Sequence, residues 1–135
     1  LQAQRFSELA ETMPHVDMWM MNTGYVGGSA KSVPEGVGYK VKIRHSSAML
    51  EAMLKGEIVW KRDPDFGYEV VDVDHPDNAA LVDRVPLHIL APARFYAENN
   101  RQDEYRSWVE RMKVERRAFL EKFSVDESII SATCG

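Results

Sequence analysis

Apolar residues near the start of the chain recur at the spacing of a helix, and the pattern then becomes a continuous apolar run. The helical positions are Phe6, Leu9, Ala10 and Met13. They predict an amphipathic helix over residues 2–13, which Pro14 would end. Residues 16–22 are almost all apolar over the length of a strand, which is typical of a strand covered on both faces.

A strictly alternating segment and a second helical pattern follow. Residues 39–45 place Tyr39, Val41 and Ile43 on one face and Lys40, Lys42 and Arg44 on the other. This alternation predicts a half-buried strand. Ser46 or Ser47 would then cap a helix, and Gly56 would end it in the left-handed conformation. The predicted buried stripe of this helix consists of Met49, Leu50, Met53 and Leu54.

The rest of the chain consists of an irregular part, one strong helix and a tail. Short strands are predicted at residues 57–60, 68–73 and 87–90, in a part that four prolines interrupt. Residues 99–123 give the clearest helical pattern, with Asn100 as the cap and one apolar face. That face comprises Tyr105, Trp108, Val109, Met112, Phe119, Leu120 and Phe123. Residues 124–135 are predicted to be a weakly ordered tail.

Composition narrows the class of protein. The 135 residues suit one modest domain, and 17 basic against 21 acidic residues give a net charge of −4. This charge argues against nucleic acid or an anionic membrane as partner, and no apolar run reaches the ~20 residues of a membrane-spanning helix. The single cysteine, Cys134, cannot form an internal disulfide, so we expect a cytoplasmic protein. The chain begins with Leu1 inside a predicted helix, which indicates a piece of a longer protein.

The glycine-rich stretch at residues 21–45 raises the question of a phosphate-binding loop. Such a loop needs two glycines before Lys-Ser or Lys-Thr, and it opens a helix. When the pattern is aligned on Lys31 and Ser32, its two glycine positions hold Tyr25 and Ala30. A proline and a glycine follow where the helix would continue, so the helix amides that hold a phosphate are missing. We interpret the stretch as a strand-to-strand connection whose glycines supply positive φ angles.

The remaining polar clusters do not form a catalytic or metal-binding set. Residues 72–78 offer three carboxylates and a histidine, but Pro76 falls where a calcium loop needs another residue. The four histidines lack the short spacing of a zinc site, and His88 is interpreted as a residue at the edge of the core. Charges of both signs are interleaved over residues 110–121, as on a solvated helix face. The residues alone therefore indicate a mixed α/β (α+β) domain with no catalytic residue and no metal ligand.

One block carries more information than its composition. The stretch "MWMMNTGYVGG…GVGYKVKIRHSSAMLEAMLKGE" resembles the carboxy-terminal region of ATP-dependent phosphoenolpyruvate carboxykinases. That family reads as an apolar strand, N-T-G-[WY]-x-G-G, G-x-G-x-R, an alternating strand and T-R-A-[MI]-[LI] in a helix. The matching positions are Asn22, Thr23, Gly24, Tyr25, Gly27, Gly28, Gly36, Gly38, Ala48, Met49, Leu50 and Gly56. Weaker similarity in "DPDFGYEV", "VPLHILAP" and "RAFLEKF" extends the resemblance over residues 1–123, which would form helices packed on a small mixed sheet.

Several positions depart from the family pattern. Lys40 stands where the family has Arg, Ser46 where it has Thr, and Ser47 where it has the next Arg. The usual P-R-N reads Pro-Ala-Arg in this sequence, and the connection between Gly28 and Gly36 is longer than usual. The chain therefore resembles a divergent member.

The resemblance implies an enzyme that converts oxaloacetate and ATP to phosphoenolpyruvate, carbon dioxide and ADP, as in gluconeogenesis. Its cofactors would be ATP with Mg²⁺ and Mn²⁺, and its phosphate-binding loop and metal ligands would lie upstream, in the remainder of the same polypeptide. The region that this chain represents would contribute one wall of the adenine pocket. By position, the nucleotide-binding residues would be Lys40, the backbone of Val41, and Ser46. A lysine keeps the charge of the family arginine but lacks its planar stacking surface.

Three functional hypotheses remain open at this point. The chain is the carboxy-terminal portion of a carboxykinase-like lyase and is inactive alone, or it is a self-standing nucleotide-binding or interaction module derived from that fold. A third hypothesis is a relative that has lost catalysis. If the chain is a fragment, its uncovered apolar surface would also promote self-association.

Overall fold

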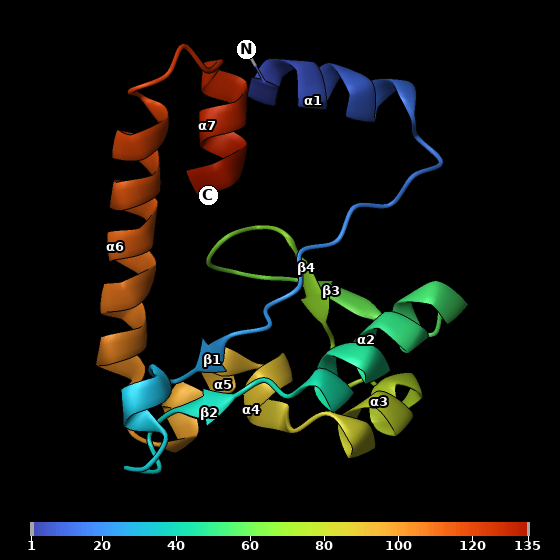
Figure 1. Cartoon of the computed structure of the whole chain (residues 1–135), viewed down its shortest axis with the longest axis vertical. Coiled ribbons are helices and arrows are strands. Elements are labelled where there is room, and N and C mark those ends of the chain that lie inside the picture. Colours follow the sequence, from blue (N-terminus) through green and yellow to red (C-terminus); the bar gives the residue numbers. More distant parts are fainter. Residues whose placement is uncertain (1, 135) are drawn as a thin grey trace. The chain divides into compact units, whose positions relative to one another are not determined.

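The computed structural model describes residues 2–134, which divide into two compact units (Figure 1). One unit comprises residues 21–63 and 68–105, and the other comprises, among the described residues, 2–20, 64–67 and 106–134. Both helices and small antiparallel sheets are present, so the mixed α+β class is confirmed. The sheet is not the single mixed one expected, because the described strands form two separate two-stranded antiparallel sheets.

The first sheet is a short hairpin. Strand β1 (Tyr25–Val26) pairs with β2 (Tyr39–Lys40), with Tyr25 opposite Lys40 and Val26 opposite Tyr39. The connection contains one 3-10 turn, η1 (Ala30–Ser32). Alternate residues of a strand face opposite sides, and here Val26 and Val41 are buried with Phe95 in a small cluster.

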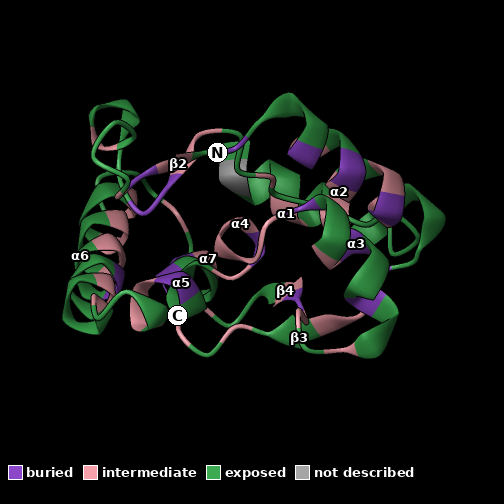
Figure 2. Ribbon diagram, turned by 90° about the horizontal axis from the view of Figure 1, so that it is seen from below, coloured by how far each residue is buried: buried purple, intermediate pink, exposed green. Residues whose placement is uncertain are grey.

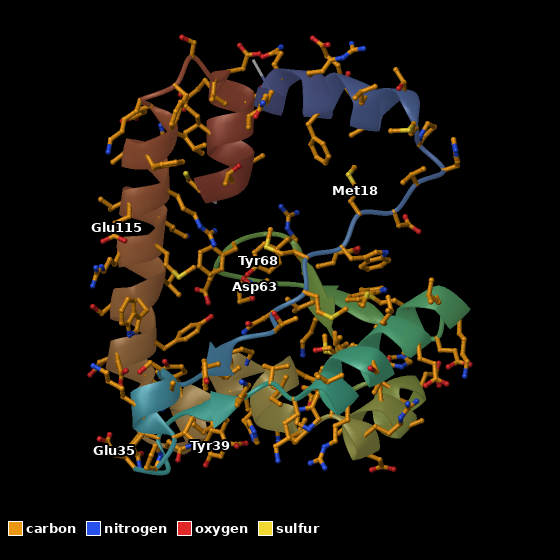
Figure 3. All side chains as sticks on the ribbon, in the orientation of Figure 1. Met18, Glu35, Tyr39, Asp63, Tyr68 and Glu115 are labelled. Carbon is orange, nitrogen blue, oxygen red and sulfur yellow. The ribbon has the colours of Figure 1, made fainter. Side chains whose placement is uncertain are left out.

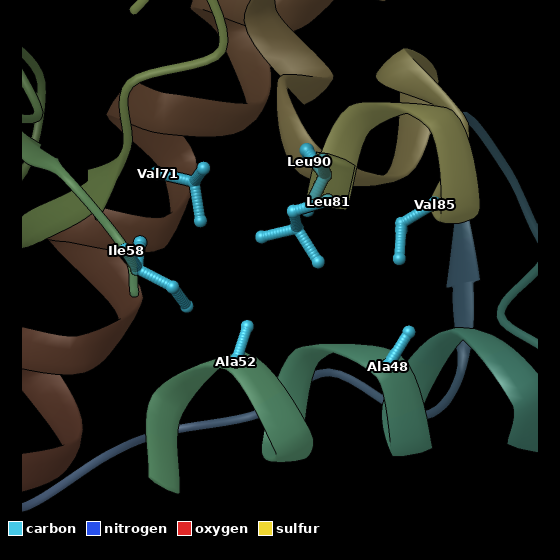
Figure 4. Packing of buried hydrophobic residues seen from close by; sticks show 7 residues of the cluster. All are labelled: Ala48, Ala52, Ile58, Val71, Leu81, Val85 and Leu90. Carbon is cyan, nitrogen blue, oxygen red and sulfur yellow. The ribbon is translucent and has the colours of Figure 1, made fainter. Parts of the chain in front are cut away.

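Helix α2 (Ile43–Lys55) forms one side of the main core. Its C-cap Gly56 has φ 67°, the left-handed conformation predicted for it. The helix packs through Ala48 and Ala52, which are buried, while Leu50 and Leu54 of the predicted stripe are exposed. Figure 4 shows the two alanines facing the larger apolar side chains of the cluster. These are Ile58, Val71, Leu81, Val85 and Leu90.

The second sheet and four short helical elements complete this unit. Strand β3 (Trp60–Arg62) pairs with β4 (Glu69–Val71), and η2 (Pro76–Asn78), α3 (Ala79–Arg84), α4 (Leu87–Leu90) and α5 (Pro92–Glu98) follow. The Asp63 amide donates to the Tyr68 carbonyl at 2.8 Å, and the two residues lie close together in Figure 3. Figure 2 shows buried segments in α2 and α3, where these helices carry core residues.

The Asn78 side chain ties the second sheet to α3. It is 1% exposed, and its amide nitrogen donates to the carbonyls of Val59 and Asp72, each at 2.8 Å. Its amide oxygen accepts from the Val59 N–H at 3.0 Å. A buried polar group without partners would cost free energy. One side chain therefore satisfies three backbone groups where the strands meet the following helix.

The other unit contains α1 (Gln2–Thr12), most of α6 (Gln102–Leu120) and α7 (Glu127–Cys134). Phe66 lies under two cations of α6, with the Arg116 guanidinium 5.1 Å and the Lys113 ammonium 5.8 Å from its ring centre. Arg117 of α6 pairs with Glu127 of α7 at 3.1 Å. Among the helices of residues 2–134, none is both long and apolar enough to cross a membrane.

Four local predictions are wrong. Residues 16–22 form no strand, because no other described segment pairs with their backbone. The predicted strand at 39–45 ends at Lys40, and α2 begins at Ile43 rather than after Ser46, because the His45 side chain accepts from the Lys42 amide and closes the first turn. Residues 87–90 form a helix, α4, because the Pro86 carbonyl accepts from the N–H groups of Ile89 and Leu90 in its first turn.

The last correction and one further observation concern the carboxy-terminal third. Asn100 is not the cap of α6; it has φ 56° and lies before the helix, which begins at Gln102. The tail expected to be weakly ordered contains α7. Ile130 and Cys134 lie four residues apart and are both buried, so an apolar stripe accompanies the ion pair of Glu127 with Arg117.

Replacing Asn78 should test its structural role. We expect Asn78→Ala to lower the free energy of unfolding by about 2–4 kcal/mol, because three hydrogen bonds are lost and buried backbone groups are left without partners. Asn78→Asp should cost at least as much at neutral pH, because a carboxylate cannot donate to two carbonyls. Urea unfolding measures both. Asn99→Ala, which removes one bond to Phe95 at an exposed position, should cost less than about 1.5 kcal/mol. Equal losses at positions 78 and 99 would contradict the assignment.

Candidate functional site

Lys40 and Tyr25 lie opposite each other on the outer face of the first hairpin. Val26 and Tyr39 of the same pairing contribute to the buried cluster, so Tyr25 and Lys40 face the other way. The Lys40 ammonium lies 5.6 Å from the centre of the Tyr25 ring. Such a contact is a cation–π interaction, in which the negative face of the ring attracts the charge.

The segment before β1 is held by the side chain of Asn22. Its amide oxygen accepts from the Gly24 N–H at 2.8 Å, and its amide nitrogen lies 3.4 Å from the Tyr25 carbonyl, to which it donates. The Gly24 carbonyl in turn accepts from the Val41 N–H at 3.0 Å. The Asn-Thr-Gly sequence therefore fixes the backbone on both sides of Tyr25.

The glycine-rich connection is a strand-to-strand loop, as predicted. Gly27 has φ 78°, and a Cβ atom there would lie 2.6 Å from the Phe95 ring and 2.7 Å from the Val37 carbonyl. Only glycine fits such a position without a shift of its neighbours. The loop satisfies its own polar groups, because Ser29 and Ser32 form a reciprocal capping box around η1.

Arg101 closes the two ends of this loop from a distant part of the sequence. Its guanidinium donates to the Gly27 carbonyl at 2.8 Å and to the Val37 carbonyl at 3.3 Å. It also makes two hydrogen bonds to Glu104 and lies over the Tyr96 ring at 4.6 Å. The planar fork of arginine suits such simultaneous contacts. The loop is therefore anchored where it leaves β1 and where it returns to β2.

Val41 joins the hairpin to α2 and is 3% exposed. Because its N–H is bonded to Gly24, a ligand cannot use that donor without breaking a backbone bond. The carbonyl of Val41 accepts no backbone hydrogen bond within the described residues. Of the two backbone groups of Val41, the N–H is thus used by the fold, and the carbonyl has no backbone partner among residues 2–134.

Ser46 lies in the first turn of α2 and is partly buried. Its N–H donates to the Lys42 carbonyl at 3.3 Å, whereas its hydroxyl has no hydrogen bond to any residue of 2–134. A serine hydroxyl can both donate and accept. The structure thus leaves the Ser46 hydroxyl available to a ligand, although Ser46 and Lys40 make no hydrogen bond with each other.

His45 sits between these residues and is 3% exposed. Its Nδ1 accepts from the Lys42 N–H at 3.2 Å, which places the proton of the neutral ring on Nε2. The approach of Arg44 Nε to Nε2, also at 3.2 Å, is then a contact between two donors rather than a hydrogen bond. Burial lowers the pKa of His45, and the charges of Arg44 and Lys42 lower it further, with a smaller effect of His88.

Three cations surround the junction of the hairpin and α2. Lys40, Lys42 and Arg44 are exposed, and none of them pairs with a carboxylate of the described residues. His88 lies on the inner side, as expected for the core edge, with its ring 4.2 Å from that of Tyr39. The outer face is therefore suited to an anionic ligand.

Two other features lie outside this junction. A hollow of about 480 Å³ lies at the far end of α2, lined by residues such as Gly56, Asp77 and Arg84, and it includes none of the three predicted nucleotide-binding residues. Within residues 2–134, no three histidine, cysteine or acidic side chains gather closely enough to hold a metal ion. The Mg²⁺ and Mn²⁺ implied by the resemblance therefore do not fit the described residues, and no chemical step can be assigned to them in this chain.

Comparison with known proteins decides the family. A sequence profile described as phosphoenolpyruvate carboxykinase matches residues 2–77, which is more than half of the chain. This chain belongs to the phosphoenolpyruvate carboxykinase family. The matched part includes the hairpin, α2 and β4, and thus Lys40, Val41 and Ser46.

Curated carboxykinases of bacteria show the same relationship. Phosphoenolpyruvate carboxykinase (ATP) 1 of Salinibacter ruber is 33% identical over 92 residues, which cover 66% of this chain and 15% of that protein. The phosphoenolpyruvate carboxykinase (ATP) of a Methylobacterium species is 34% identical over 87 residues, covering 62% of this chain and 14% of that protein. The Thermus thermophilus protein of the same name is 32% identical over 90 residues, which cover 64% of this chain and 15% of that protein. The chain thus spans about 15% of the length of the carboxykinases it matches.

Sequence reasoning missed several residues that build the junction. Arg101 had no visible signal, because its partners at Gly27 and Val37 are distant in the sequence. His45 was predicted to lie in a strand, although a side chain three residues after the N-cap can accept from the N-cap amide, as in a capping box. The sequence singled out Asn22 and Tyr25 only because they match the carboxykinase motif. The hydrogen bond of Asn22 to Gly24 and the contact of Tyr25 with Lys40 are visible only in the structure.

The buried histidines should make stability depend on pH. Burial lowers the pKa of both His45 and His88 below 6.5 in the folded chain. Just below pH 6.5 the unfolded chain therefore binds protons that the folded chain does not. Above pH 6.5 the two histidines leave the free energy of unfolding unchanged, and as the pH decreases below 6.5 the free energy of unfolding falls. Urea unfolding between pH 5 and pH 8, on the order of one unit either side of the ordinary histidine pKa, measures this fall.

A variant separates His45 from the other titrating groups. His45→Gln keeps an acceptor for the Lys42 amide but cannot take up a proton, so the loss of stability towards acid should become shallower. The exposed His15→Gln serves as the matched control and should leave the slope unchanged. An unchanged slope in His45→Gln would show that burial of this ring has no energetic consequence.

Proposed function

We propose that this chain is the carboxy-terminal part of a phosphoenolpyruvate carboxykinase (ATP)-like enzyme, and that it forms one wall of the adenine pocket. The reaction of the whole protein would be the conversion of oxaloacetate and ATP to phosphoenolpyruvate, carbon dioxide and ADP, as used in gluconeogenesis. The observation that carries the proposal is the junction of β2 and α2. Lys40 lies there with an ammonium that contacts the Tyr25 ring but pairs with no carboxylate of residues 2–134. Val41 and Ser46 lie beside it in the sequence, with a carbonyl and a hydroxyl that have no hydrogen bond among the described residues.

The three groups suit different parts of a nucleoside. The Val41 carbonyl would accept from the exocyclic amino group of adenine, since its own N–H is bonded to Gly24. The Ser46 hydroxyl would donate to or accept from the base edge or the ribose. Lys40 would lie against the base, and its charge together with Lys42 and Arg44 would favour the polyphosphate anion as a whole.

The chemistry of the reaction would belong to the remainder of the polypeptide. Phosphoryl transfer requires positioning of the phosphates and stabilisation of their charge by a loop lysine and metal ions. The glycine-rich connection of this chain is instead a closed hairpin loop with a three-residue 3-10 turn. The role assigned to this chain is therefore binding and orientation of the base.

The remainder of the same polypeptide is also the proposed partner of the exposed apolar surface. On α2, Ile43 and Leu54 are 86% and 81% exposed, and Leu50 lies on the same side at helical spacing. Relatives are several times longer than this chain, so further segments would cover such side chains. In their absence the same surface would promote self-association. We place the whole protein in the cytoplasm, without a membrane or nucleic-acid partner.

Substitutions at positions 40 and 46 should test the adenine assignment in the full-length protein. Lys40→Arg should strengthen ATP binding by about 0.5–1 kcal/mol, because a guanidinium adds a planar surface for the base. Ser46→Ala should weaken ATP binding by about 0.5–1.5 kcal/mol, the usual net value of one hydrogen bond. Calorimetric titration with ATP gives both values.

Tripolyphosphate, which lacks a base, is the matched ligand control. It should bind the parent protein and both variants with the same affinity, because neither residue is assigned to the phosphates. Parallel changes for ATP and tripolyphosphate would contradict the adenine assignment. Tight ATP binding by a full-length protein without turnover would instead support the alternative, a non-catalytic nucleotide-binding or interaction module of the same fold.

The purified 135-residue chain should form no phosphoenolpyruvate from oxaloacetate and ATP. The described residues hold no metal-binding set, and the glycine-rich loop does not open a helix at which phosphates could bind. A coupled assay with Mg²⁺ and Mn²⁺ present measures the rate. Turnover above the rate without protein would overturn the division of labour proposed for this chain.

A further inference from the structure

The ring of Tyr25 lies on the same outer face as Lys40 and is only half-buried. Directly opposed residues of an antiparallel pair share a face, and the Lys40 ammonium is 5.6 Å from the ring centre. The other half-buried tyrosines of the same unit, such as Tyr39 and Tyr96, have their rings packed against further aromatic rings. Within residues 2–134, no aromatic ring is recorded in contact with Tyr25.

The direction of this ring is set by the backbone around it. Asn22 bonds to the Gly24 N–H and the Tyr25 carbonyl, and the Gly24 carbonyl receives the Val41 N–H. Tyr25 therefore directly follows the residue whose carbonyl pairs with the Val41 backbone. An aromatic side chain on a backbone held in this way is suited to contact a flat ligand.

We propose that Tyr25 supplies the stacking surface of the nucleotide site, with adenine stacked on its ring beside the Lys40 ammonium. The inference rests on the proposed function and adds to it a residue that contributes the planar surface. A lysine has no plane on which a base can stack, whereas a neighbouring aromatic ring does. The ammonium next to the stack would attract the π faces of both rings.

The experiment compares three ligands and four proteins by calorimetric titration of the full-length protein. The ligands are ATP, GTP and tripolyphosphate. The proteins are the parent, Tyr25→Leu, Tyr25→Phe and the control Tyr68→Leu, whose ring is also partly exposed but belongs to the second hairpin. Urea unfolding of each variant establishes that it is folded.

Loss of the ring should be visible only with ligands that carry a base. We expect Tyr25→Leu to weaken the binding of ATP and of GTP about tenfold each, the magnitude of one base stacked on an aromatic side chain, because both bases have a face that can stack. Tyr25→Phe should keep ATP affinity within about twofold of the parent, because the stacking surface remains. Tyr68→Leu should change nothing, and tripolyphosphate should bind all four proteins equally.

The remaining outcomes distinguish a failure of the role of Tyr25 from a failure of the proposed adenine pocket. If ATP binds the parent better than tripolyphosphate does, yet Tyr25→Leu binds ATP as the parent does, the inference is wrong and the adenine pocket stands. Equal weakening of ATP and tripolyphosphate by Tyr25→Leu would show a structural role only and would also overturn the inference. If the parent binds ATP no better than tripolyphosphate, the proposed adenine pocket itself fails, and the role of Tyr25 fails with it.

Discussion

The side chain of Asn78 is the constraint on which the order of the main core depends. It joins Val59, at the entry to the second hairpin, to Asp72 at its exit, and its own backbone begins the turn into α3. Strand pairs of three residues are too short to be stable alone. The polar bridge holds the hairpin where Ile58 and Val71 can meet α2, so the apolar cluster and the buried amide require each other.

The position of the candidate site follows from this core. The cluster fixes α2 through two alanines, whose small side chains let the helix approach closely, and the helix start then carries Ser46 and His45. The first hairpin leads directly into the same helix, and the bond from the Val41 N–H to the Gly24 carbonyl extends the hairpin pairing by one position. Its loop is closed by Arg101, so residues far apart in the sequence set the geometry of the segment that the family pattern occupies.

The sequence predicted those features that depend on neighbours in the chain. The first helix, the Gly56 cap and the hairpin nature of the glycine-rich connection all follow from local pattern and glycine chemistry. The start of α2 was misplaced because alternation over residues 39–45 is equally consistent with a strand, and only the His45 ring in three dimensions decides it. Asn78 and Arg101 could not be predicted, since their partners are backbone carbonyls, which leave no mark in the sequence.

The positions that keep the family pattern and those that depart from it differ in what they do. Gly27 and Gly38 are retained where a side chain would collide with Phe95 or approach the Ser29 carbonyl, and Ala48 is retained where α2 meets the core. The departures at Lys40 and Ser46 fall on side chains that the fold does not use for its own hydrogen bonds. We therefore expect changes at these two positions to affect ligand preference at the proposed site more than the backbone that carries them.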